Sequence, residues 1–331
     1  MIETKDLPIR QPSEAYVFRY EAPAEIAKTQ RSVFWTPEEI NVDGDKQDFL
    51  VNMSFAEQEA IKTTLKLFTM YELLLNEAWG SRIYNDFPRP ETQMMSSTFA
   101  MMENSVHSVF YSNLNKVLMI DNEDFYLSYK NDPILAERIK FVNDAIASED
   151  LMLSIAAFTL LENCVLYSNF AFIKHYQSNG KDMIKNVVSG INFSARDEEI
   201  HAQGAAWLFN QTLSEYKDSV SKEEYGKEEK LLHDHIYELA NHLYEHEARI
   251  VDMLFSNGPI PGITADSLKE FIKSRINLTL LNLNLEEVFK VEDNPVAEWF
   301  YAGVSGISQH DFFAITGNSY RRDWDEKEFT F

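Results

Sequence analysis

The sequence is poor in cysteine and in basic residues, and both shortages exclude classes of function. One cysteine among 331 residues cannot build a disulfide framework, a zinc ribbon or a dithiol redox centre. The 30 lysines and arginines face 53 acidic residues, so a net charge of −23 would repel a phosphate backbone. Residues 1–6 are charged and lack the apolar core of a signal peptide. We therefore expect a cytoplasmic protein that binds neither nucleic acid nor membrane.

Proline and glycine are scarce in the middle of the chain, which favours long helices. No proline occurs between residues 134 and 257, and only four glycines do. Ser54 and Glu57 have the spacing of a capping box that opens a helix. We expect an all-α protein with one domain over residues 1–320, an irregular segment at 1–50 and a flexible tail at 321–331. The expected helices are 54–79, 91–119, 123–130, 133–147, 149–177, 181–216, 221–256 and 265–288.

One apolar stretch, Leu153 to Ile173, resembles a membrane span but contains the carboxylate Glu162. An isolated carboxylate is costly in lipid, and equally costly in a protein core unless it is paired or bound to a metal. We therefore interpret this stretch as a helix buried on all sides. Glu162 then needs a partner.

Glutamate and histidine pairs at helical spacing offer such partners. Glu198 and His201 lie three residues apart and share a helix face, and Asp197 could accept a hydrogen bond from a ring nitrogen beside them. Such a pair also occurs on ordinary solvated faces. Glu103 and His107 lie four residues apart in an apolar context, with the alternative of a satisfied core histidine.

Two further residues are candidates for the same site, with weaker support from spacing alone. Tyr111 continues the stripe of Glu103 and His107 by one further turn. On the helix that follows Ser54, Glu72 shares the apolar face of Leu65 and Phe68, and it is a better inward candidate than Glu77. These positions match a four-helix bundle in which carboxylates and Glu-x-x-His pairs bind two metal ions. Oxygen and imidazole ligands suit iron or manganese.

A rival histidine cluster lies further along the chain. His242 and His246 share a helix face that could bind zinc, and His233 and His235 precede them. Charged residues surround the cluster on every side, so a solvated helix face is the favoured interpretation.

The metal-ligand candidates and several motifs together resemble the small (β) subunit of class I ribonucleotide reductase, a ferritin-like family with a dimetal site and a tyrosyl radical. The matching motifs occur in the same order as in the family, from about Ser32 to the end of the chain. It rests on Phe34-Trp35-Thr36-Pro37-Glu38-Glu39, His107-Ser108-Val109-Phe110-Tyr111, Leu161-Glu162, Ala195-Arg196-Asp197-Glu198-Glu199-Ile200-His201, Asn294-Pro295 with Trp299, and Asn318-Ser319-Tyr320.

The resemblance implies a role for each of these residues. The metal ligands would be Glu72, Glu103, His107, Glu162, Glu198 and His201. Tyr111 would hold the radical, with Leu166 and Phe170 as apolar neighbours that protect it. Trp35, Asp197 and Tyr320 would transfer the radical to a separate large subunit, which reduces ribonucleotides to deoxyribonucleotides. The ions would be Fe/Fe, with Mn/Fe or Mn/Mn as alternatives.

Two departures from the family pattern affect the metal site. The first ligand is usually aspartate, whereas position 72 is glutamate, as in some relatives that use manganese plus iron. The family also has Glu-x-x-His where this chain has Glu103 four residues before His107. We predict a one-residue, π-type widening that lets Glu103 reach the metal. The rival is a displaced Glu103 and a site with one carboxylate fewer.

The tail and the lone cysteine bear on partners. Residues 323–331 are acidic and end in aromatic residues, which suits docking of the tail 321–331 into a groove of the large subunit. A homodimer is implied by the resemblance. Cys164 alone cannot supply the thiols that ribose reduction requires, so it is interpreted as packing. The alternatives are a ferritin-like oxidase or monooxygenase that acts on its own substrate, and a non-catalytic iron-storage protein.

Overall fold

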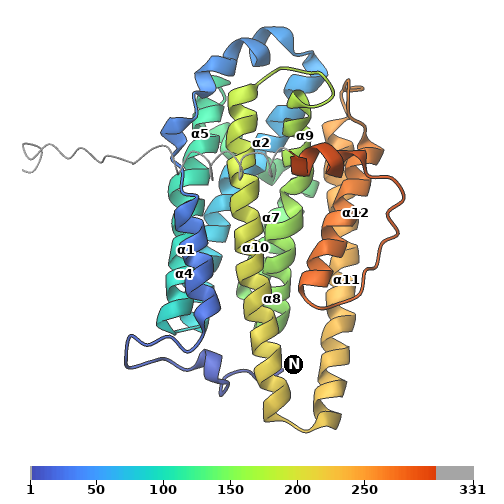
Figure 1. Ribbon diagram of the computed structural model, residues 1–331. Helices are drawn as coiled ribbons and strands as arrows, with labels where there is room; N and C mark the ends of the chain where they lie inside the picture. Colours follow the sequence, from blue (N-terminus) through green and yellow to red (C-terminus); the bar gives the residue numbers. More distant parts are fainter. Residues whose placement is uncertain (1, 303–331) are drawn as a thin grey trace, which may run out of the picture.

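The computed structural model describes residues 2–302 and is a bundle of long helices, with no strand in that range (Figure 1). The long helices are α1 (Glu21–Ser32), α2 (Phe55–Glu77), α4 (Pro90–Met102), α5 (Ser108–Val117), α7 (Pro133–Ala147), α8 (Leu151–Leu160), α9 (Tyr167–Lys174), α10 (Lys185–Ser219), α11 (Lys222–Leu254) and α12 (Ala265–Asn282). The short helices are α3 (Tyr84–Asp86) and α6 (Glu123–Leu127), and residues 295–302 are also helical. The all-α, ferritin-like prediction is confirmed.

Capping side chains set several helix starts where the sequence places them. The Ser54 hydroxyl accepts a hydrogen bond from the Glu57 amide, and Glu57 accepts one from the Ser54 amide at 2.9 Å. Asp132 caps α7 and precedes Pro133 at its first position. Helix α10 begins four residues later than the expected position 181, after Ile184 with a φ of 45°.

The N-terminal segment departs from the irregular structure expected for residues 1–50. Helix α1 occupies Glu21–Ser32 and packs against α4 and α10 (Figure 1). Its residue Gln30 is fully buried although it is polar. Packing against two core helices therefore stabilises a helix that has few strongly apolar residues of its own.

Helices α8 and α9 form the centre of the bundle. Together with the segments that join and follow them they span Leu151–Gln177, which is the one run among the described residues long and apolar enough to cross a membrane. Of its most apolar window, 94% is buried inside the protein, so it is a core helix. Cys164 is buried in this run, with its sulfur 3.2 Å from Oγ1 of Thr279. It packs against α12, as the sequence indicates.

Candidate metal centre

Six buried carboxylate and imidazole side chains, of the kinds that can bind a metal, converge at the middle of the bundle from four parts of the chain. They are Glu72 on α2, Glu103 and His107 on the segment η6 (Glu103–His107), Glu162 on η8 (Leu161–Val165), and Glu198 and His201 on α10. They form two overlapping groups, within each of which one ligand atom per residue lies within 4.8 Å of the others. The first group contains Glu72 and His107, the second contains Glu162 and His201, and Glu103 and Glu198 belong to both. Two shared carboxylates suit a pair of bridged ions.

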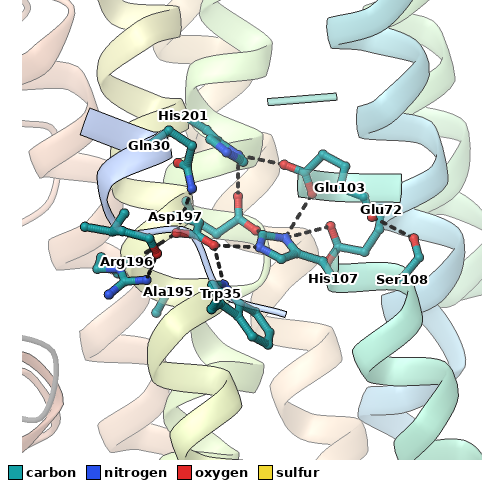
Figure 2. Close-up of polar contacts among 12 residues, drawn as sticks. Gln30, Trp35, Glu72, Glu103, His107, Ser108, Ala195, Arg196, Asp197 and His201 are labelled. Carbon is teal, nitrogen blue, oxygen red and sulfur yellow. Dashed lines mark hydrogen bonds and ion pairs between the residues drawn. The ribbon is translucent and has the colours of Figure 1, made fainter. Parts of the chain in front are cut away.

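The widening predicted before His107 is present, because η6 is π-helical. This π-helical segment directs the side chain of Glu103 toward the cluster (Figure 2). One of its oxygens, Oε2, lies 3.1 Å from Nδ1 of His107, and the other, Oε1, lies 2.6 Å from Nδ1 of His201. The side chain therefore points toward both histidines rather than away from the site. The segment η8 around Glu162 is π-helical as well; such bulges are frequent at functional sites.

The cluster concentrates buried carboxylates, and their pKa values show the mutual repulsion that a bound cation would relieve. Burial, followed by the charge of Glu103, raises the pKa of Glu72 well above its usual range. Burial and the charge of Glu198 do the same to the pKa of Glu162. Burial alone would lower the pKa of His107 and of His201, but the Glu103 carboxylate raises both. The carboxylates repel one another, and bound cations would relieve that repulsion.

Unpartnered atoms test whether metals fit the site. Both oxygens of Glu72 and of Glu198 are buried and make no hydrogen bond within the described part of the chain. The same holds for Oε1 of Glu103, Oε2 of Glu162 and both ring nitrogens of His201, although Oε1 of Glu103 and Nδ1 of His201 form a 2.6 Å ion pair. Buried polar atoms are seldom left without a partner, so this set indicates ligand atoms. Oxygen and imidazole donors fit two iron or manganese ions.

Asp197 connects His107 to the outside of the cluster (Figure 2). Its Oδ2 accepts a 2.8 Å hydrogen bond from Nε1 of Trp35 and lies 3.1 Å from Nε2 of His107. Its Oδ1 accepts a 2.9 Å hydrogen bond from Gln30. Because the aspartate accepts, the proton of His107 belongs on Nε2, which leaves Nδ1 for a metal. Asp197 thus pairs with the ring of His107, not with that of His201 on its own helix.

Tyr111 lies fully buried one turn beyond His107. Its ring centroid is 4.6 Å from that of Phe68, which packs in turn against Phe170 at 5.7 Å. Burial, followed by the charge of Glu72, raises the pKa of the phenol well above its usual range. Leu166 is buried in the same core. Besides the adjacent Phe110, whose ring centroid lies at 5.1 Å, Phe68 is a direct aromatic neighbour of Tyr111, and its position four residues before Glu72 could have identified it.

Two other site neighbours carry no clear signal in the sequence. Gln30 lies in the segment expected to be irregular. Trp79, in the π-helical segment η5 (Ala78–Ile83), donates a hydrogen bond to Glu162. Tyr320 lies outside the residues that the structure describes.

The rival histidine cluster does not form a metal site among the described residues. His246 is buried, with Nε2 2.9 Å from the carbonyl oxygen of Ile134. The side chain of His242 is 54% exposed and lies 3.8 Å from Glu137. The interpretation as a solvated helix face therefore holds for His242, whereas it is wrong for His246, which is 4% exposed.

Comparison with known proteins identifies relatives of this chain. The family model described as "Ribonucleotide reductase, small chain" matches residues 13–295. The ribonucleoside-diphosphate reductase subunit beta of Bacillus subtilis is 28% identical over 310 residues, covering 87% of this chain and 85% of the relative.

Solved structures agree in fold. The dimanganese(II)-NrdF of Streptococcus sanguinis superposes with a TM-score of 0.73 at 19% identity, covering 89% of this chain and 99% of that one. A putative class I ribonucleotide reductase from Bacillus halodurans gives a TM-score of 0.75 at 22% identity, covering 86% and 100%. At these identities the structural likeness bears on the fold alone.

Proposed function

Because the chain belongs to the ribonucleotide reductase small-chain family, we propose that its buried cluster binds two metal ions and generates a radical on Tyr111. The protein is the small subunit of a class I ribonucleotide reductase and acts with a large subunit. The observation that carries the site assignment is the set of unpartnered oxygen and nitrogen atoms on Glu72, Glu103, Glu162, Glu198 and His201. No hydrogen bond within the described residues explains why these atoms are buried.

The first group of side chains would hold one ion and the second group the other, with Glu103 and Glu198 shared between them. When bound, the metals would react with an oxygen-derived oxidant and so supply the oxidising power that removal of an electron from a phenol requires. Fe/Fe is the first candidate, and Mn/Fe and Mn/Mn are the alternatives, since the donor set suits either element. The choice between iron and manganese arises because position 72 is glutamate where the family usually has aspartate.

The chain's own residues would shield and deprotonate Tyr111. Full burial against Phe68 excludes water from the phenol. Loss of an electron makes the phenol strongly acidic, so its hydroxyl proton needs an acceptor. Glu72 is the carboxylate whose charge acts most strongly on Tyr111. We assign it that role.

A relay of hydrogen bonds would lead the oxidising equivalent outward. His107, Asp197 and Trp35 are joined by contacts of 3.1 and 2.8 Å. The indole of Trp35 can carry the oxidising equivalent. Asp197 accepts hydrogen bonds from the ring nitrogens of both Trp35 and His107. Tyr320 would continue the relay, and residues 321–331 would dock on the large subunit. We also propose a homodimer and a cytoplasmic location, the latter in keeping with an apolar helix whose most apolar window is 94% buried inside the protein.

Electron paramagnetic resonance tests the proposal. The protein is loaded with Fe(II) or Mn(II) and exposed to an oxidant, and a tyrosyl radical signal is expected that Tyr111→Phe abolishes. Removal of residues 322–331 should leave this signal intact and abolish turnover with the large subunit. A metal-loaded protein without the signal would favour an oxidase that acts on its own substrate. Turnover by the truncated protein would contradict the docking role.

A further inference from the structure

Trp79 makes a direct hydrogen bond to one of the proposed metal ligands. Its indole Nε1 donates to Oε1 of Glu162 at 2.5 Å, and both side chains are 1% exposed. Trp79 lies seven residues after Glu72, where α2 passes into η5. The bond therefore links the end of the helix that carries Glu72 to the π-helical segment that carries Glu162.

The indole is held in one orientation by its surroundings. Its ring meets the ring of Phe99 edge to face at a centroid distance of 4.9 Å. The backbone carbonyl of Trp79 accepts a hydrogen bond from the hydroxyl of Ser96. Phe99 in turn packs on His201 at 4.3 Å. Packing on one side and a backbone anchor on the other fix the direction of the indole N–H.

This bond leaves Glu162 with one free oxygen. Oε1 is committed to Trp79, whereas Oε2 makes no hydrogen bond and lies 3.8 Å from Nδ1 of His201. If Oε1 turned toward a metal, the buried indole N–H would lose its only acceptor among the described residues, which is unfavourable. Glu72 and Glu198 differ, because neither of their oxygens is committed to a hydrogen-bond donor among the described residues.

We propose that Trp79 is a positioning residue that restricts Glu162 to binding the second metal through Oε2 alone. The inference rests on the proposed function, because it presumes an ion among Glu103, Glu162, Glu198 and His201. The two ends of the centre then differ. At the first, Trp35 acts through Asp197 on His107, and at the second, Trp79 acts on a ligand directly.

The test is Mn(II) titration of the metal-free protein, followed by calorimetry and electron paramagnetic resonance. Trp79→Phe keeps an aromatic ring against Phe99 but removes the N–H. Benzothienylalanine introduced at position 79 removes the N–H at nearly unchanged ring size, which covers the case in which Trp79→Phe does not fold. Trp207→Phe is the control, since Trp207 is half-buried on α10 and meets the ring of Tyr20 edge to face at a centroid distance of 5.7 Å.

The unaltered protein and Trp207→Phe should bind two Mn(II) ions and show the spectrum of a coupled pair. Removal of the Trp79 N–H should weaken the second ion about 10–100-fold and leave the first in place. The spectrum should then become the six-line signal of an isolated ion at substoichiometric loading. Coupled spectra and affinities unchanged by both position-79 variants would overturn the proposal, as would equal losses in Trp207→Phe. Fewer than two ions in the unaltered protein would instead refute the dimetal site itself.

Discussion

The indole of Trp35 donates a 2.8 Å hydrogen bond to Asp197 in a position where the aspartate also faces His107. All three side chains are at least 98% buried. One carboxylate therefore joins a candidate metal ligand to an oxidisable ring near the start of the chain. The geometry makes Asp197 the connection between the metal centre and any longer transfer route.

Asp197→Asn should break this connection without changing the shape of the side chain. An amide NH₂ would replace one of the two acceptor oxygens that now receive the donors of Trp35, Gln30 and His107. Turnover with the large subunit should fall by at least about 10–100-fold, the range typical of residues behind a metal ligand. Asp218→Asn, at an exposed position on the same helix, is the control. Turnover within twofold of the unaltered protein would contradict the assignment.

Glu72→Gln should change stability in opposite directions with and without metal. The buried carboxylate is repelled by Glu103 and has no hydrogen bond among the described residues, so a neutral amide should stabilise the metal-free protein by about 1–2 kcal/mol. Metal binding stabilises only the folded state, and the amide should reduce that gain. Thermal unfolding with Mn(II) and with chelator measures both effects.

The control for this prediction is Glu77→Gln on the same helix, where the side chain is exposed. It should leave both unfolding temperatures unchanged. If Glu72→Gln destabilised the metal-free protein instead, the carboxylate would be making a favourable contact there, and its role as a ligand held under repulsion would be wrong.

Much of this fold could be predicted because its signals are local. Helix α7 has the predicted bounds, since Asp132, Pro133 and the following apolar pattern define it within one stretch of chain. The widening at Glu103 was also predictable, because Glu103 lies four residues before His107 where the family that the chain resembles has Glu-x-x-His. Both inferences depend on neighbours in the sequence.

The features that were missed depend on contacts between distant segments. Spacing on α10 relates Asp197 to His201, yet its partners are His107, Trp35 and Gln30 from three other segments. Helix α1 is stabilised by packing on α4 and α10 more than by its own pattern. The Trp79 contact with Glu162 spans 83 residues. Helical periodicity identifies a face but not what that face meets.

Lys174 should make stability depend on pH. It is 4% exposed and donates a 2.8 Å hydrogen bond to the carbonyl oxygen of Phe300, and burial lowers its pKa from 10.5 to about 7. Below pH 7 the lysine is protonated in both the folded and the unfolded state. Between pH 7 and 10.5 only the unfolded state holds the proton, so this group makes stability rise with pH.

The size of the effect is about 1.4 kcal/mol for each pH unit in that window. Urea unfolding from about pH 7 to pH 9 should show this extra slope in the unaltered protein, and Lys174→Met should remove it. Lys140→Met, at a side chain 73% exposed, should leave the slope unchanged. Equal slopes in the unaltered protein and in Lys174→Met would show that the lysine stays charged when buried.

Two helical glycines should respond oppositely to alanine. Gly190 on α10 lies against Phe110, and a Cβ there would come within 2.3 Å of the ring. Phe110 packs on Trp35 at 5.7 Å, so a displaced ring would disturb the relay as well as the core. Gly190→Ala should therefore destabilise the protein by about 1–3 kcal/mol. In Gly226→Ala the new Cβ meets nothing within 4 Å, and the change should stabilise α11 by about 0.5–1 kcal/mol. Urea unfolding measures both, and a stabilising Gly190→Ala would mean that Phe110 can move without loss.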